Sequence, residues 1–264
     1  MALWRLLTLP VVLAVAAGTA HGAPITVVSA ENVYGGIAAQ IGGDEVAVTS
    51  ILSSPDQDPH LFEASPSTAK ALAEARVIIM NGADYDPWMK KLIPSGKPES
   101  RLVIDVAELV GRKPGDNPHL WYDLDAVRTF AAKFEQILAA EDPVHETDYS
   151  KRLAAFGAEL EGISKKVRSM RERYAGVPVT ATEPVFGYMA EAIGLDMRNT
   201  PFQTAIMNDT EPSISQVAAF EDDLKQHKVE VVLHNSQVTA PATARLLALA
   251  EANGIPSVGI TETK

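Results

Sequence analysis

The tripeptide Pro-His-Leu occurs twice in this chain, within DQDPHLFEAS (56–65) and DNPHLWYDLD (116–125). Proline fixes its own φ and restricts the residue before it, so His60 and His119 each lie in a stiff stretch of backbone. A stiff loop suits a metal ligand, because the ligating atom must be held closely in place. The repeated context therefore makes His60 and His119 candidate metal ligands.

Both histidines follow predicted strands. Short Val- and Ile-rich runs at 25–30, 45–52, 76–82 and 102–107 alternate with helical patterns, one of which has Ser65 as its N-cap and Pro66 at its first position. This alternation predicts βα units and a mostly parallel sheet. His60 and His119 fall in strand-to-helix loops, and we expect Asp123 to cap the helix after the second loop. In open parallel sheets, ligands bind beyond the carboxyl ends of the strands.

The pattern then changes and later resumes. Residues 123–174 carry almost no strand signal, and the charge mixture and helical spacing from residue 148 to 176 predict a long, partly exposed helix. Strands are again predicted at 177–182, 229–235 and 256–260. The predicted fold class is therefore α/β, with two lobes, each a mostly parallel sheet flanked by helices, joined by one long helix. We place the N-terminal lobe at 24–142, the linking helix at 143–175 and the C-terminal lobe at 176–264.

Two acids occupy equivalent strand-end positions in the second lobe. Glu183 directly follows the strand at 177–182, and Glu262 follows the strand at 256–260. Two imidazoles and two carboxylates suit Zn²⁺, Mn²⁺ or Fe²⁺ better than Cu⁺ or Ca²⁺. The alternatives are that Glu183 only favours a helix N-terminus and that Glu262 is solvated. His234, at a strand end, is a reserve ligand.

Composition narrows the class of protein. The chain has 264 residues, 46% of them hydrophobic, which is enough to bury a core. Residues 1–23 have the layout of a signal peptide, with Arg5, an apolar run and small residues before a cut after Gly22 or Ala23; an uncleaved membrane anchor is the alternative. The net charge of −11 argues against nucleic acid as a partner. Because there is no cysteine, we expect no disulfide, no thiolate ligand and no lipid-anchor Cys, hence a periplasmic protein.

Four segments together resemble the substrate-binding proteins of metal-type ABC importers, the zinc/manganese receptor family. They are DPHLFEASPSTAKALAEARVIIMNGADYDPWMKKL, NPHLWYDLDAVRTFAAKF, ATEPVFGYMAEAIGL and EPSISQVAAFEDDLKQHKVEVVLHN. The resemblance implies two α/β lobes bridged by one rigid long helix, with the metal buried in a cleft between them. It implies that the ligands are His60, His119, Glu183 and Glu262, and that a membrane permease is the partner of a monomeric receptor.

The chain departs from the family pattern at several positions. Zinc-preferring members usually have a third histidine where this chain has Glu183, and manganese-preferring members have Glu there. The fourth ligand is usually Asp, not Glu as at position 262, and residues 61–116 contain no histidine-rich loop. These features favour Mn²⁺, although the affinity order of divalent metals favours Zn²⁺. Relatives continue beyond the last ligand, so we expect the second lobe to be incomplete at Lys264.

The expected function is capture of a divalent metal and its delivery to the permease, without catalysis. Metal affinity should fall at acid pH, because protons compete for His60 and His119. An exported metal-dependent hydrolase is an alternative, since two histidines and a carboxylate can activate water, but the chain has no HExxH or GxSxG motif. A metal-binding surface adhesin is a third alternative.

Overall fold

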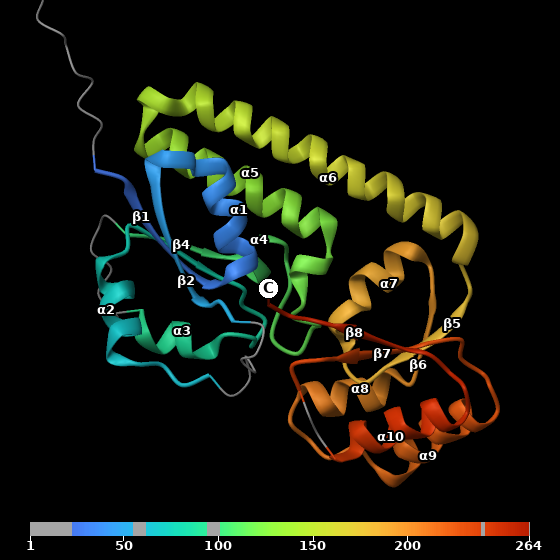
Figure 1. Cartoon of the computed structure of the whole chain (residues 1–264). Helices are drawn as coiled ribbons and strands as arrows, with labels where there is room; N and C mark the ends of the chain where they lie inside the picture. Colours follow the sequence, from blue (N-terminus) through green and yellow to red (C-terminus); the bar gives the residue numbers. More distant parts are fainter. Residues whose placement is uncertain (1–22, 55–61, 94–100, 239–240, 264) are drawn as a thin grey trace, which may run out of the picture.

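The computed structural model describes residues 23–54, 62–93, 101–238 and 241–263. It contains two four-stranded sheets, one in each half of the chain, with strand orders β2-β1-β3-β4 and β6-β5-β7-β8. Every pairing in both sheets is parallel. A single long helix, α6, runs along both lobes (Figure 1). The predicted α/β architecture with two lobes and a long joining helix is confirmed.

The N-terminal lobe has helices on both faces of its sheet. Its elements are β1 (Ile25–Glu31), α1 (Asn32–Gly42), β2 (Val46–Leu52), α2 (Pro66–Glu74), β3 (Val77–Met80), α3 (Pro87–Leu92), β4 (Leu102–Asp105), α4 (Val106–Leu109) and α5 (Leu124–Glu141). Val77 and Ile79 face the core formed with α1, α5 and α6, whereas Ile78 and Met80 face the core under α2 and α3. Strand β3 is therefore apolar throughout, as expected for a strand covered on both faces.

The C-terminal lobe repeats this plan with a smaller core. Its elements are β5 (Pro178–Ala181), α7 (Gly187–Ile193), β6 (Asp196–Arg198), α8 (Thr200–Met207), α9 (Ile214–Lys225), β7 (Val232–Asn235), α10 (Pro241–Ala252) and β8 (Ser257–Ile260). Phe202 and Phe220 pack edge to face in the core of this lobe. Short 3₁₀ turns occur in both halves of the chain: η1 (Gly43–Glu45), η3 (Leu120–Tyr122), η4 (Pro143–His145) and η5 (Pro184–Phe186).

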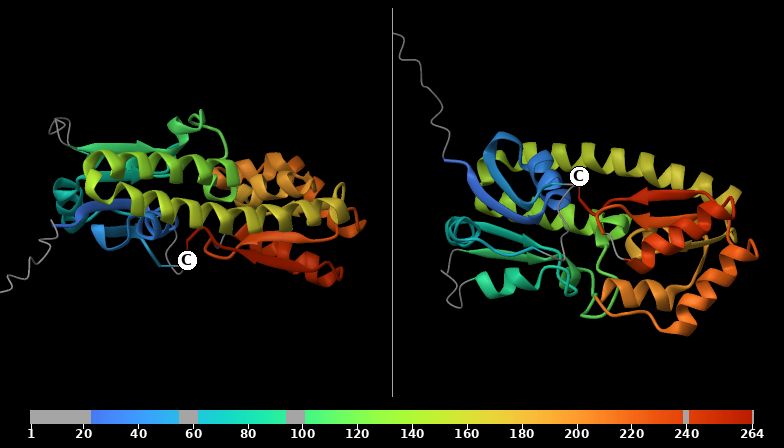
Figure 2. Two further views of the ribbon diagram at one scale, coloured as in Figure 1. Left: turned by 90° about the horizontal axis from the view of Figure 1, so that it is seen from above. Right: turned by 60° about the horizontal axis from the view of Figure 1, so that its bottom comes forward.

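Helix α6 (Glu146–Tyr174) has 29 residues, which at 1.5 Å per residue makes it about 43 Å long. Its first half packs on α5 through buried Tyr149 and Phe156, and its end contacts α7, where Arg171 donates to two backbone carbonyls. The view from above shows α6 crossing from one lobe to the other (Figure 2). Among the described residues, no helix is both long and apolar enough to cross a membrane.

Local signals set most element boundaries. Ser65 and Thr68 form the predicted cap of α2, and Asp123 caps α5 by accepting from two backbone N–H groups. The strand predicted at 102–107 ends earlier, because the Asp105 carboxylate accepts from Glu108 N at 3.1 Å and starts helix α4. Strand β6 and helix α8 were not predicted. The strand predicted at 229–235 begins at Val232.

Candidate metal site between the lobes

Three of the four predicted ligands lie buried between the lobes. His119 opens the η3 turn after β4 and α4, Glu183 directly follows β5, and Glu262 follows β8. Their side chains belong to residues that are 0%, 4% and 1% exposed. His60 lies outside the described residues. Buried ionisable groups need partners, so the contacts of these three decide what the site can do.

His119 and Glu262 face each other across the lobes. The Nε2 atom of His119 lies 3.8 Å from Oε2 of Glu262, and both side chains are fully buried. This separation is too long for a hydrogen bond. A Zn²⁺ ion bound to both atoms at its usual bond lengths and the tetrahedral angle would place them about 3.4 Å apart. The two atoms therefore stand close to the spacing that a shared cation requires.

Asn235, the last residue of β7, joins the two carboxylates of the C-terminal lobe. Its Nδ2 donates to Glu183 Oε2 at 2.7 Å and also to Glu262 Oε1. The NH₂ group of this amide thus lies between the two buried carboxyl groups. Sequence reasoning missed Asn235, although its position at a strand end beside the cleft is the same signal that selected Glu183 and Glu262.

Tyr85 reaches Glu262 from the N-terminal lobe. Its hydroxyl donates to Glu262 Oε2 at 2.5 Å, and burial followed by the charge of Glu262 raises the pKa of Tyr85 well above its usual range. The indole of Trp121 packs edge to face against Tyr85 and His119, with ring centroids 5.0 and 5.4 Å away. Aromatic rings thus keep bulk water from this side of the site, and the site has ligand-orienting contacts from both lobes.

Asn117 holds the imidazole of His119 from the opposite side. Its Oδ1 lies 2.6 Å from His119 Nδ1 and accepts from His119 N at 3.1 Å. An amide oxygen cannot donate, so Nδ1 carries the proton and the lone pair is on Nε2, the nitrogen that faces Glu262. This is the arrangement found where histidine ligates a metal through Nε2.

A second buried acid pair lies behind the site. Glu31, at the end of β1, is 0% exposed, and no N–H or O–H group of another described residue donates to its carboxyl oxygens. Burial and then the charge of Asp86 raise the pKa of Glu31 well above its usual range, while burial raises the pKa of Asp86 to about 6. Asp86 accepts from the backbone N–H groups of Asn81 and Gly82 at 2.7 and 2.8 Å, which favours its charged form. Because Asp86 has these donors and the pKa of Glu31 is raised well above its usual range, Glu31 is the member of the pair that carries a proton.

The other histidines among the described residues lie away from the candidate site. His145 pairs with Asp142 at the surface, His227 is exposed, and the ring of His234 packs near Gly259 of β8. Within the described ranges, no group of three or more His, Cys, Asp or Glu side chains is already arranged as a metal site. His119 and Glu262 oppose each other, and Asn235 brings Glu183 next to Glu262, so the assignment of all four ligands stays a prediction.

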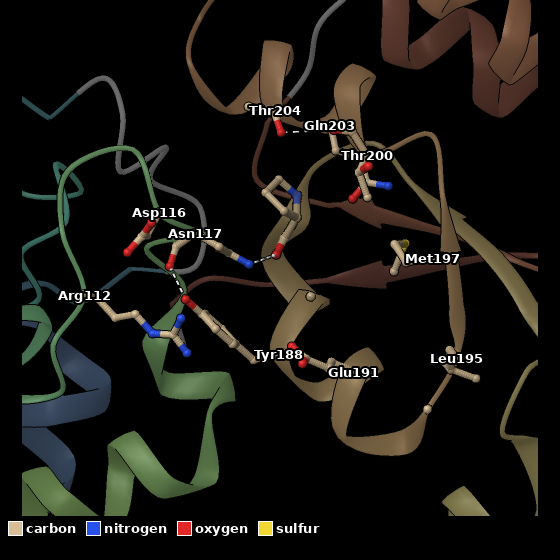
Figure 3. A pocket seen from close by; sticks show the side chains of 13 residues that line it. Arg112, Asp116, Asn117, Tyr188, Glu191, Leu195, Met197, Thr200, Gln203 and Thr204 are labelled. Carbon is tan, nitrogen blue, oxygen red and sulfur yellow. Dashed lines mark hydrogen bonds between the residues drawn. The ribbon is translucent and has the colours of Figure 1, made fainter.

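A cavity of about 600 Å³ opens beside the site, between the loop that precedes η3 and helices α7 and α8. Arg112 and Asn117 enter it from one lobe and Tyr188 from the other (Figure 3). The guanidinium of Arg112 lies 5.0 Å from the centre of the Tyr188 ring. The two lobes thus touch through polar and aromatic side chains around the buried carboxylates and imidazole.

Known proteins share both this fold and this sequence pattern. The manganese ABC transporter substrate-binding lipoprotein PsaA of Streptococcus mitis is 26% identical over 237 residues, covering 83% of this chain and 74% of the relative. The iron ABC transporter substrate-binding lipoprotein MtsA of Streptococcus pyogenes serotype M1 is also 26% identical, with the same coverage.

Solved structures have the same fold. The crystal structure of ZnuA superposes with a TM-score of 0.75 at 23% identity, covering 91% of this chain and 92% of that one. The periplasmic zinc-binding protein TroA of Treponema pallidum gives 0.75 at 20% identity, covering 90% and 88%. The family model of ZnuA, the periplasmic component A of a zinc-uptake complex, matches residues 27–263, and the chain belongs to this family.

Proposed function

We propose that this protein is an extracytoplasmic solute-binding protein that captures a divalent transition metal and delivers it to an ABC permease. One observation supports this most directly: in the family's fold, an imidazole of one lobe faces carboxylates of the other in a buried cleft. The metal is cargo, so the site needs to bind and release an ion and has no substrate to transform.

The donor atoms define the class of cargo. The proposed donors are one imidazole nitrogen from His119, up to four carboxylate oxygens and a second nitrogen from His60, and the chain has no cysteine. Nitrogen and oxygen donors of this kind suit Mn²⁺, Zn²⁺ and Fe²⁺. Relatives named for manganese, iron and zinc share the fold or the sequence pattern. Glutamate at position 183 in place of a third imidazole favours Mn²⁺ as the physiological cargo.

Binding would proceed by replacement of contacts that already exist. Glu262 accepts from Tyr85 and Asn235, and a cation placed between Glu262 and His119 Nε2 would compensate the buried negative charge that these two donors now hold. The long helix α6 packs on both lobes, so we expect small lobe shifts on loading. Hydrogen exchange that revealed wide opening of α6 contacts on loading would contradict this expectation.

Cellular location forms part of the proposal. The apolar N-terminal segment, residues 1–23, would direct export and be removed, and the mature receptor would work outside the cytoplasmic membrane as a monomer. Mass spectrometry of the protein purified from cells tests the cleavage after residue 22 or 23. A retained N-terminus would favour the uncleaved anchor.

The deciding experiment is metal content and competitive titration with Zn²⁺ and Mn²⁺ of the purified chain from residue 24. We expect one tight equivalent in the wild type and its loss in a His60→Ala, His119→Ala double variant. His227→Asn is the matched control, because His227 is exposed and has φ of 52°, which asparagine tolerates. Equal binding by wild type and double variant would refute the site, and metal-dependent turnover would refute the receptor.

A further inference from the structure

Asn117 touches both lobes with a single side chain. Its Oδ1 binds the ring and backbone of His119, and its Nδ2 donates to the carbonyl oxygen of Pro184 at 2.8 Å. Pro184 is the residue directly after Glu183. Figure 3 shows the Asn117 amide pointing across the cavity edge to this carbonyl. One amide group therefore connects the candidate ligand of the N-terminal lobe to the segment that carries a candidate ligand of the C-terminal lobe.

The C-terminal lobe leaves space for the side-chain amide of Asn117 at the start of α7. A Cβ atom at Gly187 would lie 2.7 Å from Asn117 Nδ2, so the amide can approach the start of α7 only because residue 187 is glycine. The φ and ψ of Gly187 are −56° and −50°, an ordinary helical conformation, so backbone freedom does not require glycine here. The hydroxyl of Tyr188 donates to the backbone carbonyl of Asn117 at 2.7 Å. Three residues of the segment 184–188, namely Pro184, Gly187 and Tyr188, thus accommodate Asn117.

We propose that Asn117 is a positioning residue that makes the metal-binding tautomer of His119 depend on contact between the lobes. This inference rests on the proposed function, because it assigns His119 Nε2 the role of a metal ligand. While the lobes touch, Pro184 requires a donor from the amide, so Nδ2 faces Pro184 and Oδ1 faces His119. The imidazole must then carry its proton on Nδ1, and Nε2 presents its lone pair to the cleft.

Separation of the lobes removes the contact with Pro184, and only the bond from His119 N–H to Oδ1, at 3.1 Å, then opposes rotation of the amide. Without the Pro184 acceptor, the Asn117 amide can rotate and present its NH₂ group to Nδ1. The imidazole then carries its proton on Nε2, and a protonated nitrogen cannot ligate a metal. Capture would thus be strongest when the lobes are in contact, and pulling them apart would weaken the hold on the ion. This gives a route for handing the metal to a partner that separates the lobes.

The experiment uses Gly187→Ala in the full chain, with Gly162→Ala as control. Among the described residues, a Cβ at Gly187 would meet Asn117 and Pro184 but no candidate ligand, and alanine favours the helix that begins there, whereas a Cβ at Gly162 in α6 meets nothing within 4 Å. We expect Gly187→Ala to lower the affinity for Zn²⁺ and Mn²⁺ by about 10- to 100-fold, the usual effect of losing a contact that orients a ligand, and Gly162→Ala to leave it unchanged.

A second measurement separates positioning from general damage. The ¹⁵N chemical shifts of His119 in the metal-free protein report which ring nitrogen is protonated. We expect the Nδ1–H form in the wild type and a growing share of the Nε2–H form in Gly187→Ala. Asn117→Asp, which keeps an acceptor for Nδ1 but loses the donor to Pro184, should retain the Nδ1–H form.

These experiments separate failure of the proposed coupling from failure of the proposed function. Tight metal binding by the wild type with unchanged affinity and tautomer in Gly187→Ala would overturn the coupling and leave the receptor standing. A wild type that binds no metal would refute the receptor, and the tautomer measurement on the metal-free proteins would still decide whether contact between the lobes sets the protonation of His119.

Discussion

The buried pair of Glu31 and Asp86 should make the metal-free protein less stable as the pH rises. Burial raises both pKa values in the folded state, so the folded protein holds protons that the unfolded chain releases. Stability from such groups is fully present below their unfolded pKa and is lost as pH rises through the folded pKa. Stability is therefore lost over a pH range that begins near pH 4 and extends through about pH 6 for Asp86 and to higher pH for Glu31.

The size of this loss of stability follows from the shift in pKa. A rise in the pKa of Asp86 from 3.8 to about 6 corresponds to about 3 kcal/mol of folding free energy lost across the window. Glu31→Gln replaces the protonated acid by a neutral group of nearly the same shape that cannot lose its proton in this pH range. The difference in unfolding free energy between variant and wild type should grow with pH, by up to about 1.4 kcal/mol per pH unit for one proton.

Urea denaturation in a chelator from pH 4.5 to pH 8.5 measures this difference. Glu251→Gln is the control, because Glu251 is exposed on α10 and should give a difference that does not change with pH. A flat difference for Glu31→Gln, or one that falls with rising pH, would refute the assignment of a proton to Glu31. The groups that face Glu31 and Asp86 are Tyr34, Tyr85 and Asp105. The tyrosines stay neutral throughout this range, since burial raises their pKa.

Three further outcomes are expected. Tyr85→Phe removes the 2.5 Å bond to Glu262 and should weaken metal binding by about 10- to 100-fold in competitive titration, and unchanged affinity would contradict the orienting role. Metal loading should alter tryptophan fluorescence through Trp121, and Trp121→Phe should abolish most of the change. Asp223→Ala removes two bonds to Arg198, at 2.8 and 2.9 Å, and should lower the unfolding free energy by about 1 to 3 kcal/mol at pH 7 in urea, without changing metal affinity. Because the hydrogen bond to Arg198 lowers the pKa of Asp223, this loss should shrink as pH falls below 3.8.

Much of the fold was predictable because its signals are local. Apolar strands buried on both faces, the Ser65 cap and the long charged helix depend on neighbours in sequence, and each is found in the structure. The early end of β4 also has a local cause, because the Asp105 side chain caps the next helix. Asp105 lies within an apolar run, and that run by itself predicts a longer strand. Strand β6 is only three residues long and is half exposed, so its pattern was too short to detect.

The candidate ligands could also be selected from the sequence, because parallel strands place their carboxyl ends at one edge. Strand-end position and the repeated Pro-His-Leu select His119, Glu183 and Glu262 as candidates, and the structure buries all three. His60 remains a prediction. The sequence pattern alone could not reveal what holds these side chains, since Tyr85 and Asn235 are separated from the candidate ligands they contact by 177 and up to 52 residues.

The sequence by itself therefore determined the class of fold and the family, and it predicts the chemical type of the site, because residue identity and spacing carry those properties. Only the tertiary structure decided the protonation and orientation of the site. The tautomer of His119 depends on the side-chain amide of Asn117, which contacts the other lobe. The protonation of Glu31 depends on its burial beside Asp86. Both are consequences of desolvation and contact between distant segments, and a pattern of neighbouring residues contains neither.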